Sequence, residues 1–342
     1  YETNVDIKDL LMDPENFDFR PHPDSELIDA GEPIDGITDG FIGGAPDQGA
    51  YESGGEMWIP GISWNLVEVF GDGFSEPEPM YDGSTFHVSE SGSNNNDGSI
   101  NEPFSSIQFA YDRADQYDTI LVHPGTYYDD IWLYGKNVVM GSLYLTTGDT
   151  TFIGSTVIDG DSTDCTIAIY GDIDSTCRVS GFTIQNGIGC VYGQGAGIYI
   201  ESASPRLDNL IIKNNFGGTN GGGICLNGNS NAFIDNVVIK NNSADTGGGL
   251  YSFNSNPVIT NSLIQNNHSN NGAGVFLQLG SPIFGNVIIT DNDAVSSGGG
   301  IYCGLTSSPI LNQVTISNNS ASIGGGILSI QNSQPIFSNS IL

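Results

Sequence analysis

Acidic and basic side chains at equivalent positions of neighbouring repeats are the first residues here that could do chemistry. A metal-dependent polysaccharide lyase needs clustered carboxylates and a basic residue, and a glycosidase needs two carboxylates about 5–10 Å apart. The candidates are Asp208 and Asp235, one repeat apart, with Lys213, Lys240 and Arg206 nearby. Because these positions are expected to face outward, we expect a small exposed cluster. It is either a weak catalytic candidate or a solvated patch of mutually neutralising charges.

Two aspartate-glycine turns present the hard oxygen donors that calcium prefers. One turn carries Asp159, Asp161 and Asp164, and the other carries Asp35 and Asp39. Neither has the twelve-residue calcium loop that ends in glutamate, so solvated turns without a metal are the alternative. The cofactor prediction is therefore none or Ca2+.

Aromatic side chains recur at one position of the repeat. The residues are Tyr199, Tyr251, Phe276 and Tyr302, and Cys225 shares their column. Outward aromatics stacked coil upon coil could bind sugar rings or a partner. The alternative is a self-stacking surface ladder that only stabilises the sheet.

Glycine-rich triplets followed by an aliphatic residue recur every 25 or 26 residues, from Gly195 to Gly324. Between them lie short β-branched stretches bounded by Gly, Asn and Pro, and none has the length or pattern of a helix. This period predicts an all-β, single-stranded right-handed parallel β-helix with coils of 25–27 residues. Such coils stack at about 4.8 Å.

Stacked coils place equivalent residues in ladders along the axis. Two ladders are the expected core: Leu207, Ile234, Ile259, Phe284, Leu311, Phe337 and Ile212, Ile239, Ile264, Ile289, Ile316. The Lys213 column should face outward because side chains alternate along a strand. We expect Asn214 and its equivalents to point inward and bond between coils. The following Asn215 and its equivalents should adopt the left-handed turn conformation.

The alternation of Gly-Gly-Gly-Ile and Ile-x-x-Asn-like units resembles the repeats of chlamydial polymorphic outer-membrane proteins. More broadly, it resembles the secreted pectate-lyase-like β-helix superfamily. The resemblance covers residues 178–342 most clearly. It implies the fold and a bacterial, secreted or surface setting. It selects no activity, because the superfamily includes lyases, glycosidases, adhesins and inert stalks.

The front half supplies the expected domain boundaries. Residues 84–131 resemble the opening of secreted bacterial β-helix proteins, with a capping helix at about 105–114 and Ser105 as its N-cap. Residues 1–61, an irregular extension, resemble the closing end of a β-helix. A linker over 62–83 then leads into the β-helix of 84–342.

Two outward columns and the two ends of the chain are expected to contact other parts of the chain or a second copy of it. The apolar columns are Arg206, Phe233, Val258, Ile283, Ile310, Ile336 and Ile211, Val238, Leu263, Ile288. We expect residues 1–80 or another chain to cover them. Leu342 falls in the column of Ile212, so the last coil has an open edge. We expect residues 1–52 of one copy to complete that coil in the next copy, head to tail.

Charge excludes two classes of partner. The chain has 40 acidic and 8 basic residues, a formal net charge of −32, which repels nucleic acid and anionic membrane. No run approaches the roughly 18 apolar residues of a membrane span. The partners that remain are a second copy of the chain or a cell-surface polysaccharide. The chain begins at Tyr1 without a leader, so we expect a mature or excised piece.

The five cysteines form no CxxC pair and indicate no zinc site. A Cys165–Cys177 disulfide is one interpretation and buried, reduced thiols are the other.

These observations favour a secreted or cell-surface structural or adhesive domain that assembles head to tail into filaments and has no catalysis of its own. The alternative is a carbohydrate-active enzyme, either a polysaccharide lyase or a glycoside hydrolase, or a polysaccharide-binding module.

Overall fold

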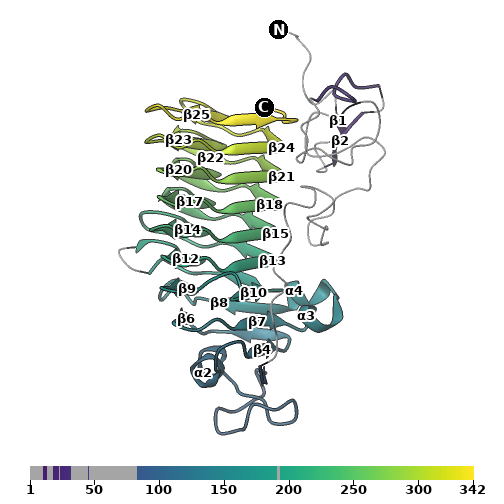
Figure 1. Ribbon diagram of the computed structural model, residues 1–342, viewed down its shortest axis with the longest axis vertical. Helices are drawn as coiled ribbons and strands as arrows, with labels where there is room; N and C mark the ends of the chain where they lie inside the picture. Colours follow the sequence, from purple (N-terminus) through teal and green to yellow (C-terminus); the bar gives the residue numbers. More distant parts are fainter. Residues whose placement is uncertain (1–10, 14–17, 23, 32–44, 46–82, 191–192) are drawn as a thin grey trace.

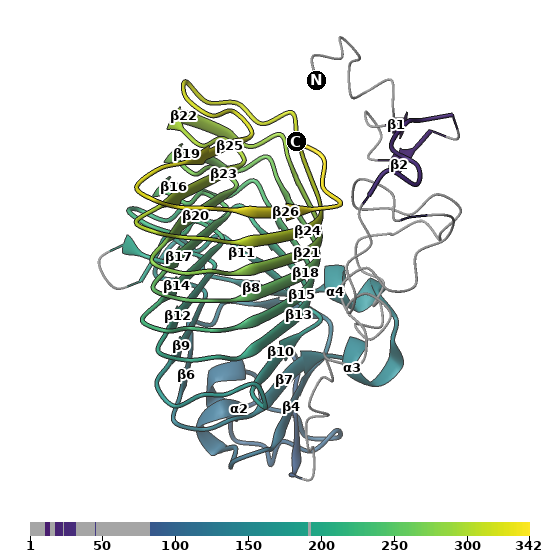
Figure 2. The same ribbon diagram turned by 45° about the horizontal axis from the view of Figure 1, so that its top comes forward.

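The computed structural model describes residues 11–13, 18–22, 24–31, 45, 83–190 and 193–342. From residue 83 onward the chain forms a β-solenoid whose coils stack along one axis (Figure 1 and Figure 2). The strands of neighbouring coils pair in parallel, for example β13 with β15 and β18 with β21. The predicted all-β parallel β-helix is confirmed.

The largest sheet has thirteen strands. Its main path is β3 (Thr85–Val88), β4 (Thr119–Val122), β7 (Val139–Ser142), β10 (Arg178–Ser180), β13 (Arg206–Lys213), β15 (Phe233–Lys240), β18 (Val258–Gln265), β21 (Ile283–Thr290), β24 (Ile310–Ser317) and β26 (Ile336–Ser338). Beside this path, β5 (Gly125–Tyr127), β8 (Thr156–Asp159) and β11 (Thr183–Gln185) pair in turn and join β13.

Two smaller sheets complete the coils. The eight-stranded sheet contains β6 (Ile131–Tyr134), β9 (Ile167–Tyr170), β12 (Ile198–Glu201), β14 (Ile224–Asn227), β17 (Leu250–Phe253), β20 (Val275–Gln278), β23 (Ile301–Gly304) and β25 (Ile327–Ser329). The three-stranded sheet contains β16 (Ser243–Thr246), β19 (His268–Asn271) and β22 (Asp293–Ser297). Separately, β1 (Leu11–Asp13) and β2 (Asp18–Pro21) pair antiparallel.

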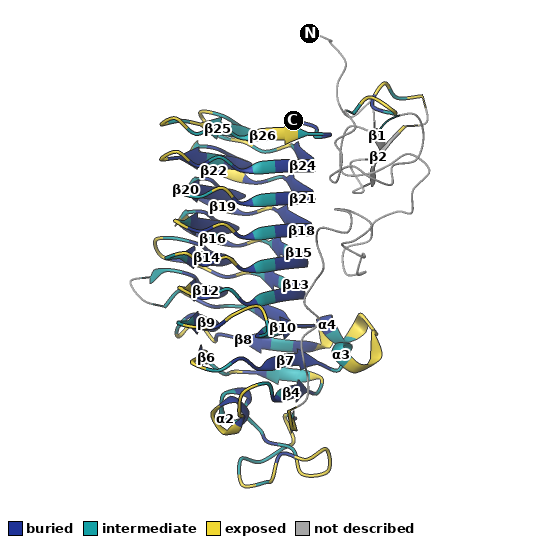
Figure 3. Ribbon diagram, in the orientation of Figure 1, coloured by how far each residue is buried: buried dark blue, intermediate teal, exposed yellow. Residues whose placement is uncertain are grey.

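The predicted inward ladders form the core. Ile212, Ile239, Ile264 and Ile289 have no exposed surface, and the Leu207 ladder is equally buried as far as Leu311. Phe337, in the last coil, is 37% exposed. Lys213 lies on the opposite face and is half-buried. Figure 3 shows this buried interior along the stack, with exposed residues mainly in the loops.

The two asparagine ladders exchange the roles that the sequence predicts. Asn214 and its equivalents have positive φ, 53° at Asn266 for example, so they are the left-handed residues. The next residues form an inward ladder of Asn215, Asn242, Asn267, Asn292 and Asn319, which is buried except for the half-buried Asn319. In it, Asn267 Nδ2 donates to Asn292 Oδ1 (3.0 Å) and to the Ile239 carbonyl (3.0 Å). The prediction is wrong by one residue, because the left-handed residue turns the chain and redirects the following side chain inward.

A further left-handed ladder was not predicted. Asn209, Asn236, Asn261 and Asn286 have positive φ within the long strands, where they bend each strand between its two apolar stretches. Asn236 Nδ2 donates to Asn209 Oδ1 (2.6 Å), and Asn286 Nδ2 donates to Asn261 Oδ1 (2.9 Å).

The outward apolar columns are only partly buried, and their cover remains a prediction. Most of their members are half-buried, namely Arg206, Phe233, Val258, Ile283, Ile310, Ile211 and Val238. Leu263 is 7% exposed and Ile288 is 1% exposed, although neither belongs to the core inside the coils. Ile336, in the last coil, is 58% exposed. Near the first coils, α4 (Thr151–Ser155) packs on β11 and β13. The predicted cover, residues 1–80, lies almost wholly outside the described residues.

Three helices occur in the described part of the chain. α2 (Ile107–Arg113) packs against β3, β4 and β6 and caps the first coil, as predicted. Its N-cap is Ser106, whose hydroxyl accepts from the Phe109 amide (3.1 Å), and not the predicted Ser105. α3 (Tyr144–Thr147) and α4 were not predicted. None of the described helices has the length and apolar character of a membrane span.

The C-terminal end of the chain has the expected register with the preceding coil. A bridge between Thr315 and Ile341 places Leu342 beside Ile316. The predicted closing segment (1–61) and linker (62–83) lie mostly outside the described residues, so those boundaries and head-to-tail assembly remain predictions.

One disulfide joins neighbouring coils. Cys165 pairs with Cys190, at a sequence separation of 25 that matches the repeat. The predicted Cys165–Cys177 pairing is wrong, because Cys177 is buried in the core inside the coils. Cys225 and Cys303 are also buried and free.

Candidate functional site

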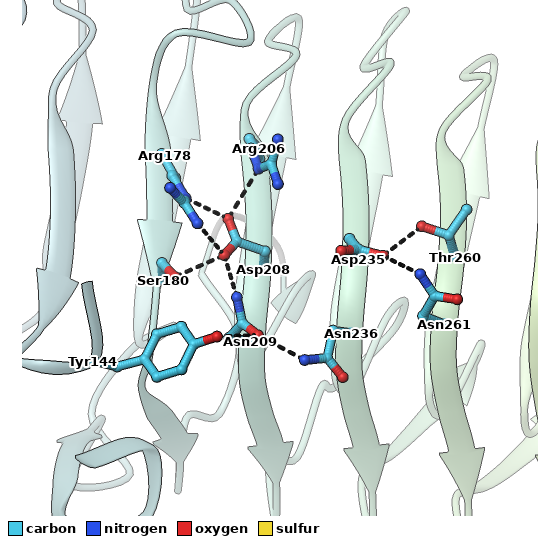
Figure 4. A network of polar contacts seen from close by, with 10 residues as sticks. All are labelled: Tyr144, Arg178, Ser180, Arg206, Asp208, Asn209, Asp235, Asn236, Thr260 and Asn261. Carbon is cyan, nitrogen blue, oxygen red and sulfur yellow. Dashed lines mark hydrogen bonds and ion pairs between the residues drawn. The ribbon is translucent and has the colours of Figure 1, made fainter. Parts of the chain in front are cut away.

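The carboxylate of Asp208 is the centre of a buried charge network on the outer face of the largest sheet (Figure 4). Arg178 Nε donates to Asp208 Oδ1 (2.6 Å) and its Nη2 donates to Oδ2 (2.7 Å). Arg206 Nε donates to Oδ1 (3.1 Å). The Ser180 hydroxyl donates to Oδ2 (2.7 Å), and the Asp208 side chain has no exposed surface.

Asp235 lies one coil above Asp208 in the same column. Its Oδ1 accepts hydrogen bonds from the Thr260 hydroxyl (2.7 Å) and from Asn261 Nδ2 (2.8 Å). The residue is 3% exposed. Both aspartates therefore have their hydrogen-bond partners within the protein.

The two carboxyl groups are shifted in opposite directions. Burial opposes ionisation of Asp208, but the hydrogen bonds and charge of Arg178, with that of Arg206, hold its pKa below the usual range. Burial raises the pKa of Asp235 to about 6, and the Asp208 charge adds to this shift. A pair of unequal carboxyl groups is typical of active sites, but here both are enclosed.

The predicted exposed catalytic cluster is therefore wrong in its exposure and its membership. Asp208 and Asp235 are buried, and Lys213 and Lys240 lie beyond the left-handed bend of their strands and are half-buried. Arg178, the strongest partner of Asp208, was not predicted. It pairs in register with Arg206 and begins the region of clear repeats, so alignment of its coil with the next could have found it.

Asp235→Asn is expected to stabilise the protein at pH 7.5 by about 1–3 kcal/mol, because a two-unit pKa shift corresponds to roughly 3 kcal/mol. The pKa is raised on folding, so the unfolded chain loses this proton first as pH rises. Wild-type stability should therefore fall between about pH 4 and pH 6 and then level off. The oxygen of the introduced amide can accept both hydrogen bonds. Urea unfolding at pH 4, 5, 6 and 7.5 checks this, and an unchanged difference at all four pH values would contradict it.

The predicted calcium turn with Asp159, Asp161 and Asp164 forms hydrogen bonds with neighbouring residues of the coils. Asp159 is buried, and its Oδ2 accepts from Gln185 Nε2 (2.8 Å) and Asn186 Nδ2 (2.8 Å). Asp164 accepts from the Cys165 amide (2.8 Å), and Asp161 is exposed. Asp35 and Asp39 lie outside the described residues. Calcium binding at either turn remains a prediction.

Two further carboxylates line a surface hollow of about 350 Å³, together with Ser105, Thr126, Tyr127 and Tyr128. Glu90 Oε1 accepts from the Thr126 amide (2.6 Å). Asp129 accepts from the Ile107 amide (2.6 Å) at the start of α2 and from the Ser106 hydroxyl (3.2 Å). Both carboxylates therefore form hydrogen bonds that stabilise the first coil and the start of α2. This structural role explains their position, and no catalytic role is needed.

The predicted aromatic column lies on the outer face of the eight-stranded sheet, but it is not open. Tyr199, Tyr251 and Phe276 are at most 8% exposed, and Tyr302 is half-buried. Phe276 stacks on Tyr251 (centroids 5.4 Å) and on Tyr302 (4.5 Å). The prediction of an exposed ladder is wrong for the first three residues. The self-stacking alternative describes Tyr251, Phe276 and Tyr302, whereas Tyr199 lies tilted against Tyr170.

The first glycine of each triplet lies close to the residue four positions later. Gly247 has a φ of 67°, and a Cβ there would lie 2.8 Å from the Cβ of Tyr251. The left-handed backbone and the close approach both require glycine. The triplet therefore packs tightly against the start of the Tyr251 side chain. The rings of the column are buried in an outward cluster that includes Cys165, Ala168 and Cys225.

Exposed aromatics occur where the triplets are absent, on the first coils. In β6, Ile131 and Leu133 are buried in the core, whereas Trp132 is 39% exposed and Tyr134 is 71% exposed. Tyr170 pairs in register with Tyr134 on the next coil. Its ring stacks on Trp132 with centroids 5.7 Å apart and 12° between the planes. We call Trp132, Tyr134 and Tyr170 the aromatic platform.

The platform was not predicted from the sequence because it lies before the exact repeats. The alternation Ile131-Trp-Leu-Tyr134 matches Ile198-Tyr-Ile-Glu201. This match could have indicated that Trp132 and Tyr134 face outward.

Comparisons with known proteins address the fold. Residues 141–321 match the family model described as the right handed beta helix region. Among curated proteins, none matches the sequence. Similar solved structures include pectin methylesterase PemA from Erwinia chrysanthemi, with 11% identity and a TM-score of 0.45 over 73% of this chain and 81% of that chain. Pectin methylesterase from Aspergillus niger has 15% identity and a TM-score of 0.42 over 77% and 84%.

A third similar structure, pectate lyase Pel9A, has 14% identity and a TM-score of 0.35 over 72% of this chain and 78% of that chain. At these identities and TM-scores, the similarity to the three structures does not assign an activity to this chain.

Proposed function

Because the chain belongs to the family of right-handed β-helix proteins, we propose that it is a secreted carbohydrate-binding module that holds sugar rings against its aromatic platform. The observation that carries the proposal is the exposure of Trp132 and Tyr134 on one outward strand face, beside the half-buried Tyr170. Flat aromatic faces with a polar edge suit ligands that have both apolar and hydroxylated surfaces.

We place binding before catalysis because the two candidate acids, Asp208 and Asp235, are buried and hydrogen-bonded within the protein. Asp208 has no exposed surface and is paired with Arg178 and Arg206. A hydrolase or lyase needs its acid and base within hydrogen-bond reach of the substrate. Adhesion to a cell-surface polysaccharide needs only the platform.

The charge of the chain supports neutral glycans as the ligand class. The formal net charge is −32, and such a field lowers the local concentration of polyanions. Polyuronates should therefore bind poorly.

The disulfide between Cys165 and Cys190 supports the secreted setting. Disulfides persist mainly in oxidising compartments outside the cytosol. A module of this kind would then meet polysaccharides at a cell surface or in the surrounding medium.

Replacing both exposed rings, Trp132→Ala with Tyr134→Ala, is expected to weaken binding of a neutral polysaccharide by about five- to 150-fold. Loss of two aromatic contacts costs about 1–3 kcal/mol, and 1.4 kcal/mol is about tenfold in affinity. Affinity gel electrophoresis with soluble xyloglucan, galactomannan and mixed-linkage glucan, and with polygalacturonate as the anionic comparison, measures this.

Tyr128→Ala is the matched control, because Tyr128 is 69% exposed and is not part of the platform. It should bind like the wild type, and all variants should keep the wild-type unfolding temperature. Equal binding by the double variant and the wild type would overturn the proposal, as would retardation by polygalacturonate alone.

A further inference from the structure

Two histidines from neighbouring coils meet at the α2 end of the solenoid. His87 lies on β3, and His123 directly follows β4, which pairs with β3. His87 Nδ1 and His123 Nε2 are 3.1 Å apart and share a hydrogen bond, in which either ring can be the donor. Val88 is buried in the core and Phe86 packs against it, so alternation turns His87 to the outer face of the sheet.

The distance between the two nitrogens suits a shared metal ion. Divalent zinc binds imidazole nitrogen at about 2.0–2.1 Å, so two nitrogens 3.1 Å apart subtend roughly 100° at the ion. This angle lies between the square-planar and tetrahedral values. The rings are inclined at 53° and are not stacked. We propose that His87 and His123 form a binding site for a divalent transition-metal ion of the zinc and copper class.

The protonation of the pair agrees with this site. Burial lowers the pKa of both imidazoles, and for His87 the neighbouring His123 lowers it further. The neutral imidazole is the form that binds metals. One facing nitrogen carries the proton of the hydrogen bond between the rings, so a metal ion replaces this hydrogen bond and that ring changes to its other tautomer.

The surroundings leave room for the rest of the coordination shell. Both residues are half-buried, so water can occupy the other positions of the ion. A group of three potential ligands among the described residues is Asp164 with Cys165 and Cys190. Its two sulfur atoms are joined in a disulfide and are not thiolate ligands. The histidine site is independent of the aromatic platform.

Titration of the tag-free protein with Zn2+ and with Cu2+, measured by calorimetry, tests the proposal. His87→Phe and His123→Phe keep the ring shape but remove the ligand atom, and each should weaken stoichiometric binding at least about tenfold. Wild-type protein should also unfold at a higher temperature with the metal, because an ion that binds only the folded state stabilises it. Neither Phe variant should show this shift.

His268→Phe and His22→Phe are the controls. His268 contacts Asp293 (3.2 Å) on the exposed surface, and His22 is exposed, so both variants should bind like the wild type. Ca2+, which prefers oxygen ligands, should not compete. Absence of stoichiometric binding to the wild type, or wild-type affinity in both His87→Phe and His123→Phe, would overturn the proposal.

Discussion

Asp208→Ala is expected to lower the free energy of unfolding by about 3–5 kcal/mol, because it breaks a buried ion pair by removing one partner. Arg178 and Arg206, with side chains 19% and 12% exposed, lose the carboxylate that they share. Ser180 loses its acceptor in the same step. Urea unfolding followed by circular dichroism measures the change.

Asp245→Ala is the control for removing an aspartate from the coils. Asp245 is exposed on β16, and surface substitutions usually change stability by less than about 0.5 kcal/mol. Asp208→Asn, which keeps the shape but not the charge, should fall between the two. If Asp208→Ala were no more destabilising than Asp245→Ala, the network would not hold these coils together.

Asn267→Ala is expected to cost about 2–4 kcal/mol, because a buried donor or acceptor without a partner costs about 1–3 kcal/mol. Asn267 Oδ1 accepts from the amide of Asn242 (3.0 Å) and from its Nδ2 (3.1 Å). Asn267 Nδ2 donates to the Ile239 carbonyl and to Asn292. Alanine removes all of these hydrogen bonds from the middle of the ladder.

The neighbouring residue supplies the control. Asn266 is exposed with a φ of 53°, so Asn266→Gly keeps the left-handed backbone and should change stability by less than about 1 kcal/mol. Urea unfolding of the two variants compares them directly. A larger loss for Asn266→Gly than for Asn267→Ala would reverse the assignment of the two ladders.

The repeat made the coils and the core predictable from the sequence. Equivalent positions such as Ile212 and Ile239 stack because each coil repeats the same strands, so one alignment gives the whole interior. The roles of the asparagine ladders were predicted one residue out of place, because strict alternation does not hold through a left-handed turn. The separation of Cys165 and Cys190 by one coil could have indicated their pairing.

The outer surface was less predictable, because alternation says which side a residue faces and not what packs over it. Asp208 faces outward and yet has no exposed surface. Tyr251 also faces outward and is only 8% exposed, because it packs in a cluster with Cys225 and Phe276. The exposed rings of Trp132 and Tyr134 lie before the exact repeat, where alignment of coils gave no ladder to follow.

The indole signal of Trp132 tests sugar binding most directly. The chain has three tryptophans, at positions 58, 64 and 132, and Trp132→Phe assigns the platform signal in a proton–nitrogen correlation spectrum. Titration with a neutral oligosaccharide should shift the Trp132 indole resonance in a saturable way, whereas a galacturonate oligomer of equal length should not. A Trp132 signal that stays in place at saturating concentrations of every neutral oligosaccharide tested would contradict the account.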